Sequence, residues 1–195
     1  MIRQRGNSLF ELLVVLAIVA LLATVTTSAM TTVLRRTDLR AATGHIRDIM
    51  QAENFEGQAN GAYRGLKFFV VGNEWFYAVY EDGNGNGVLT EDINRGIDRR
   101  IGAPRRLLAP GTLARIGFPP SGIVDPDDGR PMAPDARPVQ FGRSNICSFS
   151  DHGSCTAGTI YVTDGVSAGA MVRCSGAGGL VRVEYWGLTG SSWSN

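Results

Sequence analysis

Hydrophobic residues crowd the start of the chain. Between positions 9 and 25 every side chain is hydrocarbon-like except Glu11 and Thr24. The small and apolar residues that follow, as far as Met30, extend the run to about 20 membrane-compatible positions, enough to cross a bilayer core of roughly 30 Å. We therefore predict that residues 7–30 form a membrane-spanning helix.

A second segment carries apolar residues at helical spacing. Leu39, Ala42, Ile46, Ile49 and Met50 follow this spacing, and Glu53 continues it with a polar side chain. This period is that of one helical face. Neither proline nor glycine occurs between positions 7 and 43, and Gly57 is the expected stop. Residues 31–57 should therefore continue the same helix as an amphipathic half, with the apolar stripe packed on the rest of the chain.

Beyond Gly57 the pattern changes to short runs of β-branched and aromatic residues, separated by Gly, Pro, Asn and Asp. Such runs are typical of strands joined by turns. The strands that we predict are 66–71, 75–81, 113–118, 139–142, 159–163, 170–174 and 180–186. Most of 95–143 should be loops. The fold class is α+β, with one long N-terminal helix packed on an antiparallel β-sheet domain that occupies residues 58–195.

Composition narrows the range of functions. The chain has 195 residues, and 19 basic residues nearly balance 18 acidic ones, for a net charge of +1. After the helix, about 140 residues remain, which is one ordinary domain. This charge balance gives no strong field that would indicate a nucleic-acid partner.

The flanks of the apolar run set its expected orientation. Arg3 and Arg5 precede it, and the next basic residues, Arg35 and Arg36, lead into a long domain. The charge bias places the N-terminus in the cytoplasm and the domain outside. A cleaved secretory signal would end in a small-residue site, whereas this stretch stays apolar up to Leu34. A carboxylate such as Glu11 at the edge of the run costs a few kcal/mol unless it is paired or interfacial.

The sequence RGNSLFELLVVLAI (5–18) resembles the prepilin cleavage and methylation motif of type IV pilins and pseudopilins. The resemblance implies that a prepilin peptidase cuts after Gly6. Residues 1–6 would then be a leader peptide, and Asn7 would become the new N-terminus. The family usually has phenylalanine at this position, so the resemblance does not extend to methylation of Asn7. It also implies that Glu11 neutralises the amine of a neighbouring subunit during assembly, because opposite charges in lipid offset each other's desolvation.

The C-terminal sequences GTIYVTDG (158–165), MVR (171–173) and GLVR (179–182) resemble the GspH/FimT group of minor pilins and pseudopilins. This likeness implies a structural subunit of a type II secretion pseudopilus or a type IV pilus. Its partners would be other pilins, the prepilin peptidase and an inner-membrane assembly platform. Before assembly the chain would be a single-pass inner-membrane protein in contact with lipid, with a periplasmic domain.

Two alternatives use other residues. Relatives in natural transformation systems are similar in fold and bind DNA. The candidate DNA contacts in this chain are Arg173, Arg182 and the arginines of 95–106. The stretch 95–106 can also be explained as a solvated loop. The other alternative is a membrane-anchored, calcium-dependent adhesion module. The loop with Asp82, Asn84 and Asn86 copies the first half of a calcium site, but Ile93 stands where a bidentate glutamate should complete it. The alternative to a calcium site is a tight Asx and glycine turn. We expect no other cofactor.

Three cysteines, Cys147, Cys155 and Cys174, allow one disulfide and leave one thiol in an oxidising compartment. Cys147 with Cys155 is the preferred pair, and Cys155 with Cys174 is the rival. The only nucleophile-like grouping, Asp151-His152 near Cys155, involves a thiol that we expect to be oxidised. We therefore expect that the protein is not an enzyme.

Overall fold

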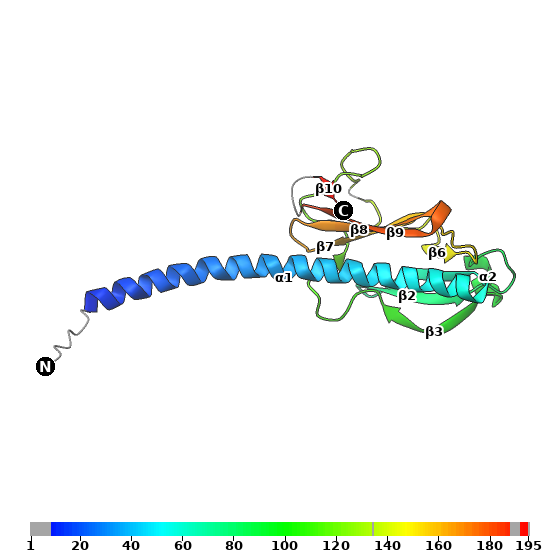
Figure 1. Ribbon diagram of the computed structural model, residues 1–195, viewed down its shortest axis with the longest axis horizontal. Helices are drawn as coiled ribbons and strands as arrows, with labels where there is room; N and C mark the ends of the chain where they lie inside the picture. Colours follow the sequence, from blue (N-terminus) through cyan, green and yellow to red (C-terminus); the bar gives the residue numbers. More distant parts are fainter. Residues whose placement is uncertain (1–8, 134, 188–191, 195) are drawn as a thin grey trace. The chain divides into compact units, whose positions relative to one another are not determined.

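The computed structural model describes residues 9–133, 135–187 and 192–194 (Figure 1). Its first element is α1, a single helix over Leu9–Asn60. The chain divides into two compact units, Met1–Arg35 and Arg36–Asn195, so α1 contributes its N-terminal half to the first and its C-terminal half to the second. The continuous helix expected from the apolar run and the following stripe is confirmed.

The predicted stop of α1 at Gly57 is wrong by three residues. Gly57 is buried inside the last turns, where a Cβ atom would lie 3.1 Å from the carbonyl oxygen of Ala62. The helix ends instead before Gly61, whose φ of 60° is left-handed. The N–H of Ala62 then donates to the carbonyl of Gly57 at 3.1 Å, which closes the helix in the manner of a glycine C-cap. Gly57 thus marks a close backbone approach.

Four antiparallel strands form one sheet, called sheet A here. They run in the order β3-β2-β1-β6, with bounds Arg99–Arg106, Glu74–Glu81, Arg64–Val71 and Ile146–Phe149. The short helix α2, Thr90–Arg95, lies in the connection between β2 and β3. The prediction of a loop over 95–106 is therefore wrong, because most of this stretch pairs with β2 as an edge strand.

The second sheet, sheet B, has the order β10-β9-β8-β7-β4, and β5 also pairs with β7. Its bounds are Trp193–Ser194, Leu180–Trp186, Gly169–Ser175, Gly158–Thr163, Arg115–Ile116 and Val139–Gln140, and a 3-10 turn, Gly176–Gly178, joins β8 to β9. The three long strands were predicted. The predicted strands at 113–118 and 139–142 form only two-residue pairings.

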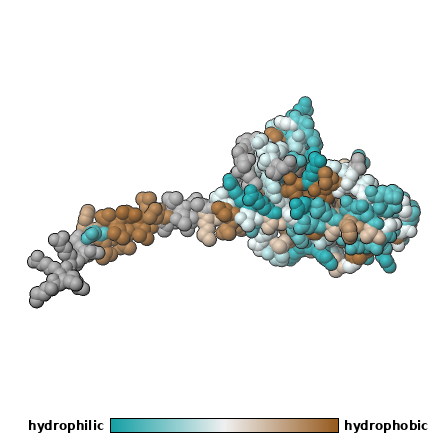
Figure 2. Space-filling model, viewed as in Figure 1, coloured by the Kyte–Doolittle hydropathy of each residue, from teal (hydrophilic) through white to brown (hydrophobic). Residues whose placement is uncertain are grey.

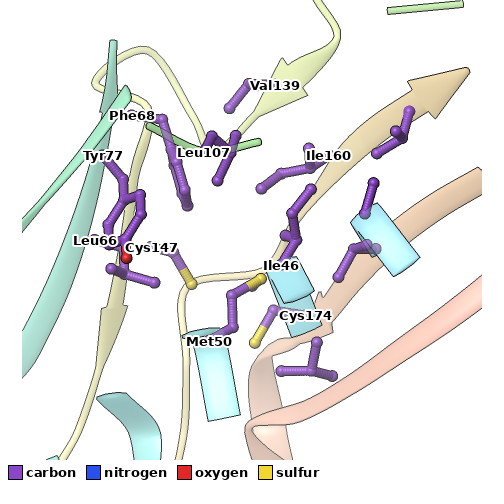
Figure 3. Packing of buried hydrophobic residues seen from close by; sticks show 14 of the residues in the cluster. Ile46, Met50, Leu66, Phe68, Tyr77, Leu107, Val139, Cys147, Ile160 and Cys174 are labelled. Carbon is purple, nitrogen blue, oxygen red and sulfur yellow. The ribbon is translucent and has the colours of Figure 1, made fainter. Parts of the chain in front are cut away.

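The core lies where α1 meets both sheets. In Figure 1 the C-terminal half of α1 crosses the domain with β2 and β3 on one side and β7, β8 and β9 on the other. The helix inserts the predicted stripe, and Leu39, Ile46 and Met50 are fully buried. Sheet A supplies residues such as Phe68 and sheet B residues such as Ile160 (Figure 3). Packing of the helix on antiparallel sheet is the α+β, pilin-like organisation expected from the sequence.

The preferred disulfide pair is wrong, and the rival pair is the one that forms, Cys155 with Cys174. Cys147 lies on β6 opposite Leu66, and its side chain is completely buried in the core. Cys155 lies instead beside the end of β8, since its N–H donates to the carbonyl of Gly176 at 3.0 Å. Alternation along β6 therefore sends the Cys147 thiol inward, and burial raises its pKa above the ordinary range.

Candidate functional site

The N-terminal end of α1 exposes apolar side chains instead of burying them. Leu9 and Phe10 are 82% and 74% exposed, and large apolar residues stay exposed as far as Leu22. Figure 2 shows this end of the chain as a largely hydrophobic surface. Burying one such side chain is worth about 1.5–3 kcal/mol. This segment therefore suits an apolar environment, either lipid or other helices.

Glu11 is the acidic residue of the first turn of α1. The helix dipole favours a negative charge at this position. The predicted cleavage residues, Gly6 and Asn7, lie outside the described residues, so processing after Gly6 stays a prediction. In the part of the chain that the structure describes, no helix combines the length and the apolar character needed to cross a membrane. The single-pass span predicted for residues 7–30 also stays a prediction.

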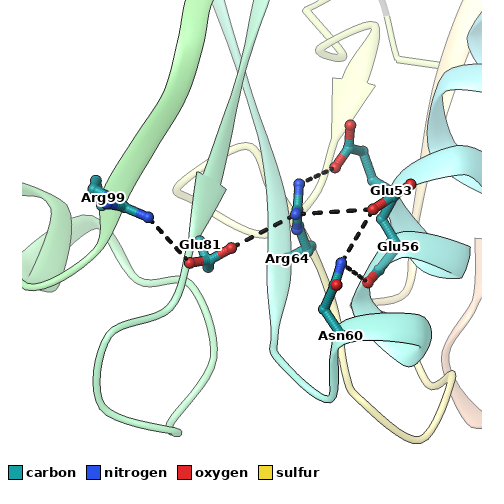
Figure 4. Close-up of polar contacts among 6 residues, drawn as sticks. All are labelled: Glu53, Glu56, Asn60, Arg64, Glu81 and Arg99. Atoms are coloured by element: carbon teal, nitrogen blue, oxygen red, sulfur yellow. Dashed lines mark hydrogen bonds and ion pairs between the residues drawn. The ribbon is translucent and has the colours of Figure 1, made fainter.

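A polar cluster joins the end of α1 to sheet A (Figure 4). The guanidinium of Arg64 lies between Glu81 on one side, at 3.6 Å, and Glu53 and Glu56 of α1 on the other, at 3.5 and 4.0 Å. Arg99 of β3 extends the cluster by pairing with Glu81 at 3.5 Å. Burial raises the pKa of Glu53 above its ordinary value, although Arg64 acts in the opposite direction. No sequence pattern indicated this cluster, since its members come from separate elements.

The Asp82 loop is organised around its own backbone. One carboxylate oxygen of Asp82 accepts the N–H groups of Asn84 and Gly85, at 2.8 and 3.0 Å, and the other accepts that of Gly87 at 2.7 Å. The amide nitrogens of Asn84 and Asn86 both donate to buried Asp92, at 3.4 and 2.9 Å. This arrangement is an Asx and glycine turn.

No metal site is evident at this loop. Within the described ranges, no group of three or more His, Cys, Asp or Glu side chains could hold a metal ion. The alternative of calcium binding through Asp82, Asn84 and Asn86 stays untested.

The two candidate DNA contacts are direct neighbours across sheet B, since Arg173 of β8 pairs with Arg182 of β9. They differ in their surroundings. Arg173 makes two hydrogen bonds to the carboxylate of Asp127, at 2.7 and 3.1 Å, and a third to Thr159. Arg182 is exposed. An arginine already paired with a carboxylate offers little charge to a phosphate. The arginines of β3 lie on sheet A, so they do not extend this pair.

The nucleophile-like grouping has no reactive thiol, because Cys155 is disulfide-bonded. The ring of His152 lies 3.6 Å from the carboxylate of Asp151, and its side chain is 88% exposed. Among the residues that the structure describes, no hydrogen bond joins this ring to a hydroxyl or a thiol, which a nucleophile and its base would share.

Comparison with known proteins gives one finding, which concerns the N-terminus. Residues 1–27 match a family model described as the prokaryotic N-terminal methylation motif. No curated protein and no solved structure shows a significant match to the chain. The motif indicates a structural subunit rather than an enzyme, and it implies assembly with other pilin subunits after contact with the prepilin peptidase. The N-terminus of this chain therefore carries a type IV prepilin-like methylation motif.

Proposed function

We propose that this chain is a minor pilin or pseudopilin of the GspH/FimT type. A prepilin peptidase cleaves it after Gly6, and it then assembles through α1 into a type II secretion pseudopilus or a type IV pilus. Before assembly it is held in the inner membrane by residues 7–30, with the N-terminus cytoplasmic and the β domain periplasmic. The assembly platform and other pilins are its partners, and the β domain supplies its contacts outside the membrane.

One observation carries the proposal, namely the position of the methylation motif. The matched residues 1–27 run directly into a helix whose apolar side chains are exposed from Leu9 to Leu22. A subunit that moves from lipid to a bundle of like helices requires such a surface, because both environments bury it. The pilin-like organisation of the domain is consistent with the same role.

Processing can be tested at the cleavage site. Gly6→Ala should block cleavage, so the membrane-bound chain should keep its leader when the N-terminus is sequenced by mass spectrometry. The matched control is Gly44→Ala, a helical glycine with nothing within 4 Å of a Cβ atom. An unprocessed wild-type chain in cells that contain an active prepilin peptidase would contradict the proposal.

Assembly can be tested at Glu11. The carboxylate is proposed to pair with the amine of Asn7 on a neighbouring subunit, and two charges in lipid are tolerated only as a pair. Glu11→Val should therefore leave cleavage intact and reduce incorporation into sheared filaments. The control is Asp48→Asn, which removes an exposed acid from the same helix. Normal incorporation of Glu11→Val would exclude the charge-pairing role.

A further inference from the structure

The end of the domain at which α1 enters is formed by neighbouring loop tips. The loop before β4 lies against the helix here, since the N–H of Leu113 donates to the carboxylate of Asp38 at 2.9 Å. Two residues later, Arg115 of β4 pairs with Thr163 at the end of β7. The turn that follows β7, which contains Val166, therefore lies at the same end of the domain as Leu113.

The hairpin between β1 and β2 reaches this end as well. Residues 73–75 of the hairpin line one hollow together with residues 108–112 of the loop before β4. Val71 pairs with Glu74 at the tip of the hairpin, so it lies beside the same hollow. Each of the three tips exposes one apolar side chain, and the exposed fractions are 55% for Val71, 41% for Leu113 and 51% for Val166.

Three exposed arginines accompany these tips, namely Arg36 and Arg40 of α1 and Arg115 of β4. None of them forms an ion pair within the described part of the chain. Arg36 and Arg40 are four positions apart, so they lie on one side of the helix. We call this set of arginines and apolar tips the entry end: Arg36, Arg40, Val71, Leu113, Arg115 and Val166.

The acids of the same region are already held by donors of the protein itself. Asp38 accepts the N–H of Leu113, and Glu74 pairs with Arg106 at 2.8 Å. Asp164 accepts three N–H groups of its own turn, at 2.8, 3.0 and 3.0 Å. The region thus holds four arginines, with Arg106 included, against three acids. The excess is only one charge, but the three arginines of the entry end are the ones accessible to an anion from outside.

The charge of α1 changes sign along the part of the helix that belongs to the domain. Residues 36–47 include three arginines and one acid, whereas residues 48–60 include three acids and neither lysine nor arginine. The helix dipole favours the reverse order, with acids first and bases last. The observed order sets the bases at the entry end, as expected if this end faces an anionic surface.

The length of the connecting chain identifies that surface. The predicted span ends at Met30, and the compact unit that contains the domain begins at Arg36. Six residues reach at most about 20 Å even when they are fully extended. The entry end therefore stays close to the bilayer surface whenever the span is in the membrane. Anionic lipids attract arginines at such a surface, and the headgroup region accepts small apolar groups.

We propose that the entry end binds anionic phospholipid headgroups while the chain awaits assembly. Its arginines contact lipid phosphates, and its apolar tips rest among the headgroups. This inference rests on the proposed function, because it requires residues 7–30 to span the bilayer. It adds a lipid contact made by the β domain itself. Because that contact breaks when a subunit leaves the membrane, the lipid charge would influence how readily the subunit is extracted.

The first experiment places a probe at the entry end. The full-length protein is reconstituted in lipid nanodiscs with a dye on Leu113→Cys. Cys147 is buried and the other two cysteines are disulfide-bonded, so the dye has one site. A spin-labelled headgroup should quench the dye in phosphatidylglycerol discs and much less in phosphatidylcholine discs. The control is Phe55→Cys, an exposed position about 25 Å further along the helix than Asp38, which should stay unquenched in both.

The second experiment tests the arginines. Arg36→Gln and Arg115→Gln should each lower the ratio of docked to undocked domain about fivefold in the anionic discs, the effect of one base at an anionic surface. The two residues lie on separate elements, so each variant tests the proposal independently. Arg95→Gln is the matched control, because it removes an exposed arginine of α2, and it should leave the ratio unchanged.

A dye on Leu16→Cys separates this inference from the proposed function. Quenching of this dye by spin labels on the acyl chains shows that the span is inserted. Without that quenching the span is wrong, and the inference is wrong with it. With that quenching, the inference alone is overturned by an unquenched probe at Leu113 in anionic discs, by equal quenching in neutral discs, or by an equal loss in Arg95→Gln.

Discussion

Replacing Arg64 with methionine should destabilise the domain in a pH-dependent way. The guanidinium contacts three carboxylates at 3.5 to 4.0 Å, and its side chain is only 14% exposed. Methionine preserves the apolar stem but removes the charge, which leaves Glu53, with a side chain 17% exposed, without its nearest cation. The expected effect at neutral pH is a lower free energy of unfolding.

The magnitude follows from the degree of burial. Removing one partner of a fully buried pair costs about 3–5 kcal/mol, whereas exposed pairs contribute about 0–1 kcal/mol. The Arg64 cluster lies between these limits. In addition, the Nε atom of Arg64 is buried without a hydrogen-bond partner in the described structure, so methionine also relieves a cost. We expect a loss of about 2 kcal/mol near pH 7, or about 4–8 °C in melting temperature for a domain of this size.

The pH dependence follows from the raised pKa of Glu53. A carboxyl whose folded-state pKa is raised contributes stability that is present below its unfolded pKa and lost as the pH rises through its folded pKa. Removing Arg64 removes the main attraction that lowers this pKa, so the folded value should rise further. The loss caused by Arg64→Met should therefore be small near the unfolded pKa of about 4.3 and should grow towards neutral pH.

The assay is thermal unfolding of the full-length protein in detergent, followed by tryptophan fluorescence between about pH 4 and pH 7. Arg47→Met is the matched control, because Arg47 pairs with Asp48 at an exposed position and should cost less than about 0.5 kcal/mol. The double variant with Glu53→Gln should recover most of the loss. An equal loss at both ends of the pH range, or no recovery in the double variant, would refute the reasoning.

Three further predictions concern stability. Gly44→Ala should raise the unfolding free energy by about 0.5–1 kcal/mol. Gly179→Ala should lower it by more than about 2 kcal/mol, because Gly179 has a φ of 57° and lies against a neighbouring backbone carbonyl. Urea titration measures both changes. Cys174→Ser should cost about 3 kcal/mol, and non-reducing peptide mapping of the wild type should recover Cys155 joined to Cys174. Calcium at about 1 mM should shift the melting temperature by less than about 1 °C, because the Asp82 carboxylate already accepts hydrogen bonds from the N–H groups of its own turn. A larger rise that disappears in Asp82→Ala would show a calcium site.

The sequence was most informative where the hydrophobic pattern was regular. The stripe from Leu39 to Met50 has a helical period, and 75–81 is rich in aromatic and β-branched residues, so both elements were predictable. Strand β3, RRIGAPRR, has no apolar alternation and contains Gly102 and Pro104. Its strand character comes from pairing with β2, which only the folded chain provides.

The candidate sites likewise differ in whether they depend on neighbouring residues in the sequence or on residues that only folding brings together. The motif around Gly6 and Glu11 is local, so its resemblance to the prepilin motif could be seen in the sequence. The choice of disulfide partners depends on the direction of the Cys147 side chain. That direction is set by the pairing of Cys147 with Leu66, which is distant in the sequence.

The order in which the strands are used has a consequence for how the domain unfolds. Sheet A consists of β1, β2, β3 and β6. Strands β4 and β5, which belong to sheet B, lie between β3 and β6 in the sequence. Neither sheet is a contiguous stretch of sequence, and α1 packs on both. Loss of one sheet would expose the apolar surface of α1 and of the other sheet that packs against it, so the domain should unfold as one cooperative unit. No truncation between the sheets should leave a folded half.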